Sequence, residues 1–231
     1  MVLARGLIGA GITIACLSTG AHAQGSVSGE LSLLDRRGSS GGDVRSGIVF
    51  LEPEGTVARN AEFPALMSAT IAMRDREFVP HVRAILAGGS VQFPNQDPFS
   101  HNVFSNGQLG AFDLGLYRRG SSKSATFARV GVYPVYCNIH SKMVSFVIAV
   151  PSPYFAQPAG NGRYVIVNVP AGRYLLHAWH ERAVTELIRE IDVPPSGISG
   201  LRSVLDVSAY FDNPHLNKFG LPYAATRADR Y

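Results

Sequence analysis

The sequence predicts an all-β protein built from β-sandwiches, and three observations support this. From Val27 onward, apolar and polar residues alternate in short runs. Gly, Pro, Asn and Asp separate these runs, and a long helical period is absent. Alternation with a period of two is typical of strands that are buried on one face. Many short strands broken by turn residues favour packed sheets over helices.

The predicted strands fall into two sets on either side of Pro158. In 144–150, for example, every second residue is apolar and shares one face, as in a half-buried strand. The turn Asn161-Gly162 and the break Val169-Pro170-Ala171-Gly172 separate strands of the second set. The first set is Val27–Leu34, Gly47–Glu52, Ala69–Met73, Ser90–Phe93, Lys123–Val130, Val132–Cys137 and Val144–Val150; the second is Tyr164–Val169, Arg173–Trp179, Glu186–Val193 and Arg202–Val207.

The first 23 residues have the layout of a secretory signal peptide. Arg5 precedes an apolar stretch, Leu7–Leu17, and the small-residue site Ala21-His22-Ala23 follows it. The apolar stretch is shorter than the roughly 20 residues of a membrane-spanning helix, so we expect no stable membrane insertion. An alternative is a lipoprotein cleaved before Cys16, although Thr13 stands where the usual lipoprotein motif has Leu. We expect an exported, periplasmic protein.

Removal of the signal peptide would leave Cys137 as the single cysteine of the mature chain. An internal disulfide is then impossible, and a lone thiol in an oxidising compartment is usually occupied, often by a metal. The formal net charge of +4 loses only Arg5, and the chain has no dense run of Lys and Arg. We therefore do not expect nucleic acid as a partner.

Cys137, His140 and Met143 place a thiolate, an imidazole and a thioether at positions i, i+3 and i+6. Together with a second imidazole, these are the ligands of copper electron-transfer sites, in which the thioether is weak and axial. His101, on a distant segment, is the candidate for the second imidazole. The four residues predict a site for one type 1 copper ion. Zinc is the alternative, but structural zinc sites rarely use a thioether.

Residues 68–152 resemble the plastocyanin and amicyanin branch of the cupredoxins. The likeness lies in the strand with Phe78 and Pro80, the strand start Gly88–Phe93, the triplet His101-Asn102-Val103 and the Cys-x2-His-x2-Met loop after Val132–Tyr136. The resemblance implies a Greek-key sandwich with His101, Cys137 and His140 as equatorial ligands and Met143 as axial ligand. It also implies that Asn102 bonds across to the ligand loop and helps to hold the thiolate, and that electrons pass through the ring edge of His140.

A second resemblance concerns Asn161–Ile166 and Val169–Leu176, which are similar to the carboxypeptidase regulatory-like (transthyretin-like) sandwich. Val27–Leu31 and Ser46–Leu51 look like the opening of that module. The hypothesis is that N-terminal strands within 24–67 and the strands of 153–208 form one smaller, Ig/transthyretin-like sandwich into which the cupredoxin domain is inserted. In the alternative, the extra strands cap the cupredoxin. Residues 209–231 are expected to be an extended tail on the surface.

Three further histidines are not expected to bind a metal. His177 and His180 would point to opposite faces of a strand, and His81 is expected at the surface. Motifs of hydrolases and phosphate-binding loops are absent, so no enzyme activity is expected.

The chain also resembles bacterial exports of the methylamine utilization protein type. The predicted function is transfer of single electrons to or from a periplasmic redox protein such as a c-type cytochrome or a dehydrogenase. The alternative is a copper-binding or interaction module without redox turnover, for copper storage or delivery.

Overall fold

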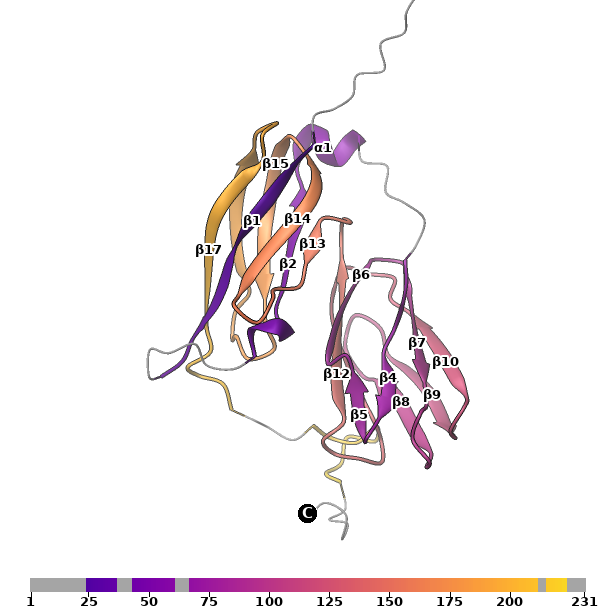
Figure 1. The fold of residues 1–231 in the computed structure, drawn as a ribbon. Helices are drawn as coiled ribbons and strands as arrows, with labels where there is room; N and C mark the ends of the chain where they lie inside the picture. Colours follow the sequence, from indigo (N-terminus) through magenta and orange to yellow (C-terminus); the bar gives the residue numbers. More distant parts are fainter. Residues whose placement is uncertain (1–23, 37–42, 61–66, 212–214, 224–231) are drawn as a thin grey trace, which may run out of the picture.

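A computed structural model describes residues 24–36, 43–60, 67–211 and 215–223 of the chain. The predicted signal peptide, with Cys16, lies outside these residues. The strands form two β-sandwiches side by side (Figure 1). We call the one formed by residues 68–150 the central sandwich, and the one formed by the strands before and after it the flanking sandwich. No helix in the described ranges is both long and apolar enough to cross a membrane.

The central sandwich packs a five-stranded sheet and a three-stranded sheet around an apolar core. Phe93, Phe127 and Ile85 are among its completely buried side chains. The larger sheet has the order β6 (Val82–Leu86), β12 (Val144–Val150), β11 (Gly131–Tyr136), β8 (His101–Ser105) and β9 (Phe112–Tyr117). The smaller sheet is β10 (Ser122–Thr126), β7 (Ser90–Pro94) and β3 (Ser68–Thr70), and β4 (Ala72–Arg74) forms a hairpin with β5 (Glu77–Val79).

The flanking sandwich combines strands from both ends of the chain. One sheet has the order β14 (Arg163–Pro170), β1 (Gln24–Leu34) and β17 (Ile198–Asp206); the other has β13 (Phe155–Ala156), β2 (Ile48–Pro53), β15 (Gly172–Trp179) and β16 (Leu187–Val193). The short helices η1 (Val44–Ser46) and α1 (Gly55–Asn60) flank β2. β1 runs antiparallel to β14 and parallel to β17, and β2 pairs with β15. The N-terminal strands thus pair with strands that follow the central sandwich.

The turn before β14 shows why a glycine stands at position 162. Gly162 has a φ of +79°, in the left-handed region that favours glycine. A Cβ atom there would lie 2.3 Å from the carbonyl oxygen of Leu31 on β1. The backbone of Gly162 in turn accepts a hydrogen bond from the Leu31 amide at 2.8 Å. The Asn161-Gly162 pair therefore allows β14 to start close against β1.

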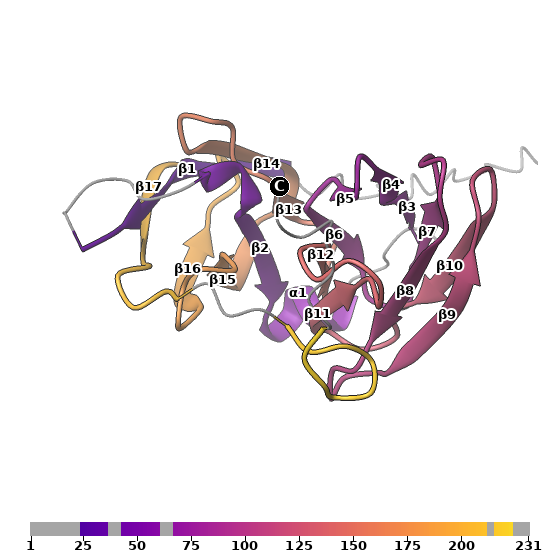
Figure 2. The ribbon, with the colours of Figure 1, turned by 90° about the horizontal axis from the view of Figure 1, so that it is seen from below.

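An apolar cluster joins the two sandwiches. It contains residues from β2 of the flanking sandwich and from β6 and β12 of the central one: Ile48, Phe50, Val82, Ala84, Ile148 and Val150. Seen from below, β2 faces the central sandwich (Figure 2). Because of this contact, both faces of β12 are covered at Val147 and Ile148, which are 0% and 2% exposed. The prediction of a half-buried strand was wrong at this point, since the flanking sandwich covers the outer face.

Two predicted strands end differently in the structure. The predicted strand Ala69–Met73 divides at Ile71 into β3 and β4, because β3 pairs with β7 whereas β4 pairs with β5. The predicted strand Lys123–Val130 ends at Thr126. The other predicted strands overlap observed ones, from β1 to β17. The described part of the tail, residues 215–223, crosses to the central sandwich and is yellow in Figure 1.

Candidate metal centre

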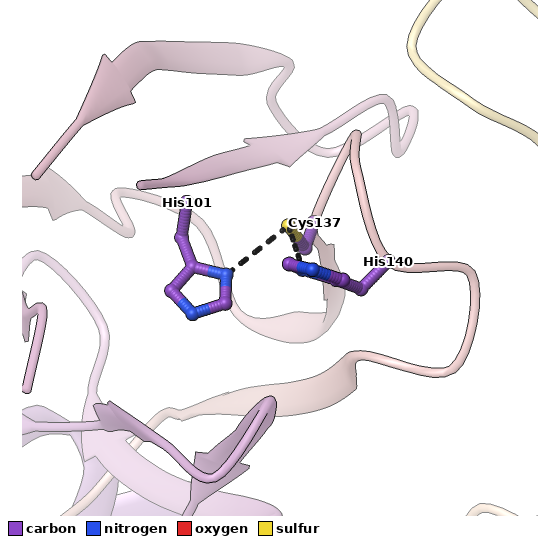
Figure 3. Close-up of side chains that lie close together, drawn as sticks. All are labelled: His101, Cys137 and His140. Atoms are coloured by element: carbon purple, nitrogen blue, oxygen red, sulfur yellow. Dashed lines mark hydrogen bonds between the residues drawn. The ribbon is translucent and has the colours of Figure 1, made fainter. Parts of the chain in front are cut away.

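His101, Cys137 and His140 lie together at one end of the central sandwich (Figure 3). Their ligand atoms are all within 4.8 Å of one another. Sγ of Cys137 is 3.7 Å from Nδ1 of His101 and 3.7 Å from Nδ1 of His140. His101 and Cys137 are completely buried, whereas His140 is half-buried. The structure thus brings the distant histidine to the loop residues, as the sequence predicted.

Strand pairing produces this arrangement. His101 begins β8, which is adjacent to β11 in the five-stranded sheet, and Cys137 directly follows β11. Tyr136 pairs with Val144 across β11 and β12, so residues 137–143 form the loop of a hairpin. At the base of this loop the Cys137 amide donates to the Met143 carbonyl at 3.2 Å. We call residues 137–143 the ligand loop.

Met143 supplies the remaining donor type. It is 1% exposed and belongs to the same buried cluster as Cys137. Its amide donates to the His140 carbonyl at 3.1 Å, which closes a tight turn inside the ligand loop. The thioether of Met143 is therefore kept away from solvent on the loop that carries the thiolate.

The donor set fits a copper ion. Bonds from metals such as zinc to imidazole and thiolate are roughly 2.0–2.3 Å long, so donor atoms 3.7 Å apart can share one ion. Two imidazoles and a thiolate with a weak thioether are the donors of type 1 copper sites. His101, Cys137, His140 and Met143 form a type 1 copper-like site. Within the described ranges, His101, Cys137 and His140 are the one group of three or more His, Cys, Asp or Glu side chains that could hold a metal.

Asp97, which was not predicted from the sequence, contacts the far side of His101. Its Oδ2 is 2.7 Å from Nε2 of His101, and the two side chains are 5% and 0% exposed. Asp97 also accepts the amides of Asp75 and Arg76 at 2.7 and 3.0 Å. Both residues have positive φ, which turns the β4–β5 hairpin toward Asp97. Four-residue spacing from His101 is the only signal of Asp97 in the sequence, and it is weak.

These contacts determine the ionisation of Asp97 and which ring nitrogen of His101 carries the proton. Burial by itself would raise the pKa of Asp97, but the hydrogen bonds from the Arg76 amide and His101 outweigh it and lower that pKa. A carboxylate at this position requires the proton of His101 on Nε2. Nδ1 is then left with a free lone pair toward Cys137, as a metal ligand needs.

The expected hydrogen bond from Asn102 to the ligand loop is not the one that the structure shows. Nδ2 of Asn102 donates instead to Oδ1 of Asp113 at 2.7 Å. Oδ1 of Asn102 is buried and has no hydrogen-bond partner among the described residues. The physical reason is the pairing of β8 with β9, which places Asp113 opposite Phe104 and within reach of Asn102.

Three further histidines, His81, His177 and His180, have separate partners. Nδ1 of His177 lies 3.0 Å from Oε1 of Glu186, whereas Nε2 of His180 lies 3.2 Å from the Asp43 carbonyl. The expectation of a surface position for His81 was wrong in part. Its side chain is 36% exposed and lies between the sandwiches, with Nδ1 3.1 Å from the Val144 carbonyl and Nε2 2.9 Å from Oε2 of Glu181.

Comparison with known proteins gives no family assignment for the chain. No family model matches it, and no curated protein matches it. Among solved structures, it is similar to a purple cupredoxin from Nitrosopumilus maritimus, with 23% identity over 36% of this chain and 99% of that chain and a TM-score of 0.33. It is also similar to amicyanin from Paracoccus versutus, with 19% identity over 44% of this chain and 97% of that chain and a TM-score of 0.34.

A third similar structure is a copper-containing nitrite reductase from Thermus scotoductus SA-01. The identity is 24% over 43% of this chain, and the TM-score is 0.35. The match spans only 25% of the reductase. At these identities and scores, the likeness does not carry a function from those proteins to this chain.

Proposed function

We propose that this chain is an exported periplasmic protein that carries single electrons and holds one copper ion with His101, Cys137, His140 and Met143. Copper bound at such a site supplies a one-electron change between two oxidation states. One observation carries the proposal. Two imidazole Nδ1 atoms from separate segments converge on one buried sulfur, 3.7 Å from each, in the ligand loop that also holds a buried thioether.

The protein supports this role by holding the donors in place. His101 is part of a sheet, and its Nε2 is held by the buried Asp97. Cys137 and Met143 are tied together at the base of the hairpin. Since the fold sets these positions, little rearrangement is required when the oxidation state of the ion changes. The burial of His101, Cys137 and Met143 also keeps water away from the donors.

We propose that electrons enter and leave near His140, the half-buried ligand. Ile139 beside it is 44% exposed, and the ring of Phe99 lies 5.7 Å from the His140 ring. An apolar surface around a half-buried imidazole is suited to brief contact with another redox protein. A periplasmic c-type cytochrome or dehydrogenase is the class of partner that we propose.

Copper loading of the exported form tests this function. The chain without residues 1–23 is purified, loaded with Cu(II), and examined for copper content and visible absorption. We expect one copper per chain, an intense thiolate-to-copper absorption band, and reversible loss of this band on one-electron reduction. Copper binding without the band, or a bound ion that cannot be cycled, would instead indicate storage or delivery and would contradict electron transfer.

A further inference from the structure

The C-terminal segment 215–223 returns from the flanking sandwich to the start of the ligand loop (Figure 2). Three consecutive residues of the central sandwich each have a partner in it. The ring of Tyr136 stacks on His215 with centroids 4.2 Å apart. The carbonyl of Cys137 accepts the Tyr223 hydroxyl at 2.6 Å. The side-chain oxygen of Asn138 accepts the Lys218 amide at 2.9 Å.

The same segment is also linked to β8, the strand that carries the buried ligand His101. Nζ of Lys218 lies 2.7 Å from Oδ2 of Asp113, and Asp113 accepts the amide group of Asn102. Asn102 directly follows His101. Segment 215–223 therefore reaches both parts of the chain that supply copper ligands. The Lys218–Asp113 pair is partly exposed, so it contributes less to holding the segment than the contacts to residues 136–138.

The segment has the local structure that these contacts need. Oδ1 of Asn217 accepts the amides of Phe219 and Leu221 at 2.9 and 3.1 Å, and the Asn217 amide donates to the Leu221 carbonyl. Gly220, with a φ of +75°, completes this turn. Such side-chain-to-backbone bonds are typical of compact turns. The turn directs the Lys218 amide toward Asn138 while the chain continues to Tyr223.

We propose that segment 215–223 is a brace that holds the ligand loop in its copper-binding conformation, with Tyr223 as a positioning residue for Cys137. The amide of Cys137 is bonded to Met143 and its carbonyl to Tyr223, so both peptide groups around the sulfur are held. The inference rests on the proposed copper function. The Tyr223 O–H donates to the carbonyl of the residue that carries the thiolate, so the positive end of its dipole faces Cys137 and favours the oxidation state of lower charge.

The substitution Tyr223→Phe removes one hydroxyl and keeps the ring. Its matched control is Tyr174→Phe, which removes a tyrosine hydroxyl that donates to the Pro170 carbonyl at 2.8 Å in the flanking sandwich. Asn138→Ala is a second variant, which removes the acceptor of the Lys218 amide. Folding of each variant is checked by circular dichroism.

Three quantities are measured: the Cu(II) spectrum, the Cu(II)/Cu(I) equilibrium, and the alkylation rate of Cys137 in metal-free protein. For Tyr223→Phe we expect an altered spectrum, a shift of the equilibrium by about two- to tenfold toward Cu(II), the range of one net hydrogen bond, and alkylation several-fold faster. Asn138→Ala should also accelerate alkylation. Tyr174→Phe should leave all three quantities unchanged.

The outcomes separate the brace from the copper function. If the wild type has the copper-thiolate band and both tail-contact variants match it in all three measurements, the brace is wrong and the electron-transfer proposal stands. If the wild type lacks the band, the copper function fails, and unchanged alkylation in the metal-free variants would then overturn the brace as well. Equal effects in Tyr174→Phe would show a general loss of stability and would also overturn it.

Discussion

Asp97 and His101 form a buried pair in which Oδ2 of the carboxylate lies 2.7 Å from Nε2 of the imidazole. Outer partners of this kind orient metal-binding histidines and increase their donor strength. The substitution Asp97→Asn removes the charge and leaves the amides of Asp75 and Arg76 to a weaker acceptor. We expect copper affinity to fall by about 10- to 100-fold, measured by competition with a chelator.

The control for this variant is Asp43→Asn in the flanking sandwich, where the carboxylate is 51% exposed and pairs with Arg45. It makes the same change of charge away from the site and should leave the affinity unchanged. Copper affinity in Asp97→Asn equal to that of the wild type would show that the carboxylate has no role in presenting His101.

The two sulfur ligands should differ in importance. Cys137→Ser removes the thiolate, and we expect loss of the intense visible band together with most of the copper affinity. Met143→Leu removes only the weak axial donor, so the band should persist while the reduction potential changes. Absorption spectra and voltammetry of the copper-loaded variants make the comparison. A band that survives in Cys137→Ser would show that the assigned ligands are wrong.

The ion pair between His81 and Glu181 joins the two sandwiches and should make stability depend on pH. The hydrogen bond to Glu181 raises the pKa of His81 despite its partial burial. Burial raises the pKa of Glu181, but the hydrogen bond and charge of His81 outweigh it and lower that pKa. The contribution of His81 to the free energy of unfolding is complete below about pH 6.5 and is lost as pH rises through its folded pKa. The contribution of Glu181 is complete above about pH 4.5 and is lost as pH falls through its folded pKa.

The pair should therefore contribute most between about pH 4.5 and 6.5. We expect Glu181→Gln to lower the free energy of unfolding by about 1 kcal/mol or less at pH 5.5, because the pair is partly exposed. The loss should be smaller at pH 8.5, where less of His81 is protonated. Urea unfolding at the two pH values measures the difference. The control is Glu190→Gln at an exposed position of β16, because it makes the same change of charge away from the pair. An effect of Glu181→Gln that grows with pH would contradict the assignment.

The apolar contact between the sandwiches should contribute more than this ion pair. Ile48 on β2 is 1% exposed and packs in the shared cluster. Ile48→Ala leaves a cavity, and we expect a loss of about 2–4 kcal/mol in the free energy of unfolding. Ile188→Ala on β16, where the side chain is 56% exposed, should change it by roughly 0.5 kcal/mol or less.

Trp179 provides the signal for this measurement. It is the single tryptophan of the chain, and its ring lies 5.5 Å from Phe146 across the contact between the sandwiches. The urea concentration at the midpoint of unfolding, followed by its fluorescence, should be lower in Ile48→Ala than in the wild type. Equal midpoints for the Ile48 and Ile188 variants would mean that the cluster does not couple the two sandwiches.

Much of the strand pattern could be predicted because alternation is a local property. The segments 132–137 and 144–150 show it, and both are strands in the structure. The division at Ile71 could not be predicted, since it depends on which partner each half meets. The covered outer face of β12 was missed for a similar reason, because burial there comes from β2, almost 100 residues away in sequence.

By itself, the sequence determined the kinds of donor and the spacing of three of them. Thiolate, imidazole and thioether stand within seven residues, so the chemistry of Cys137, His140 and Met143 can be inferred without a fold. Only the tertiary structure decided that Nδ1 of His101 reaches Cys137, that Asp97 holds the other side of that ring, and that Tyr223 bonds to the Cys137 carbonyl. These contacts join segments up to 86 residues apart, and such distances follow from strand pairing and packing rather than from local preference.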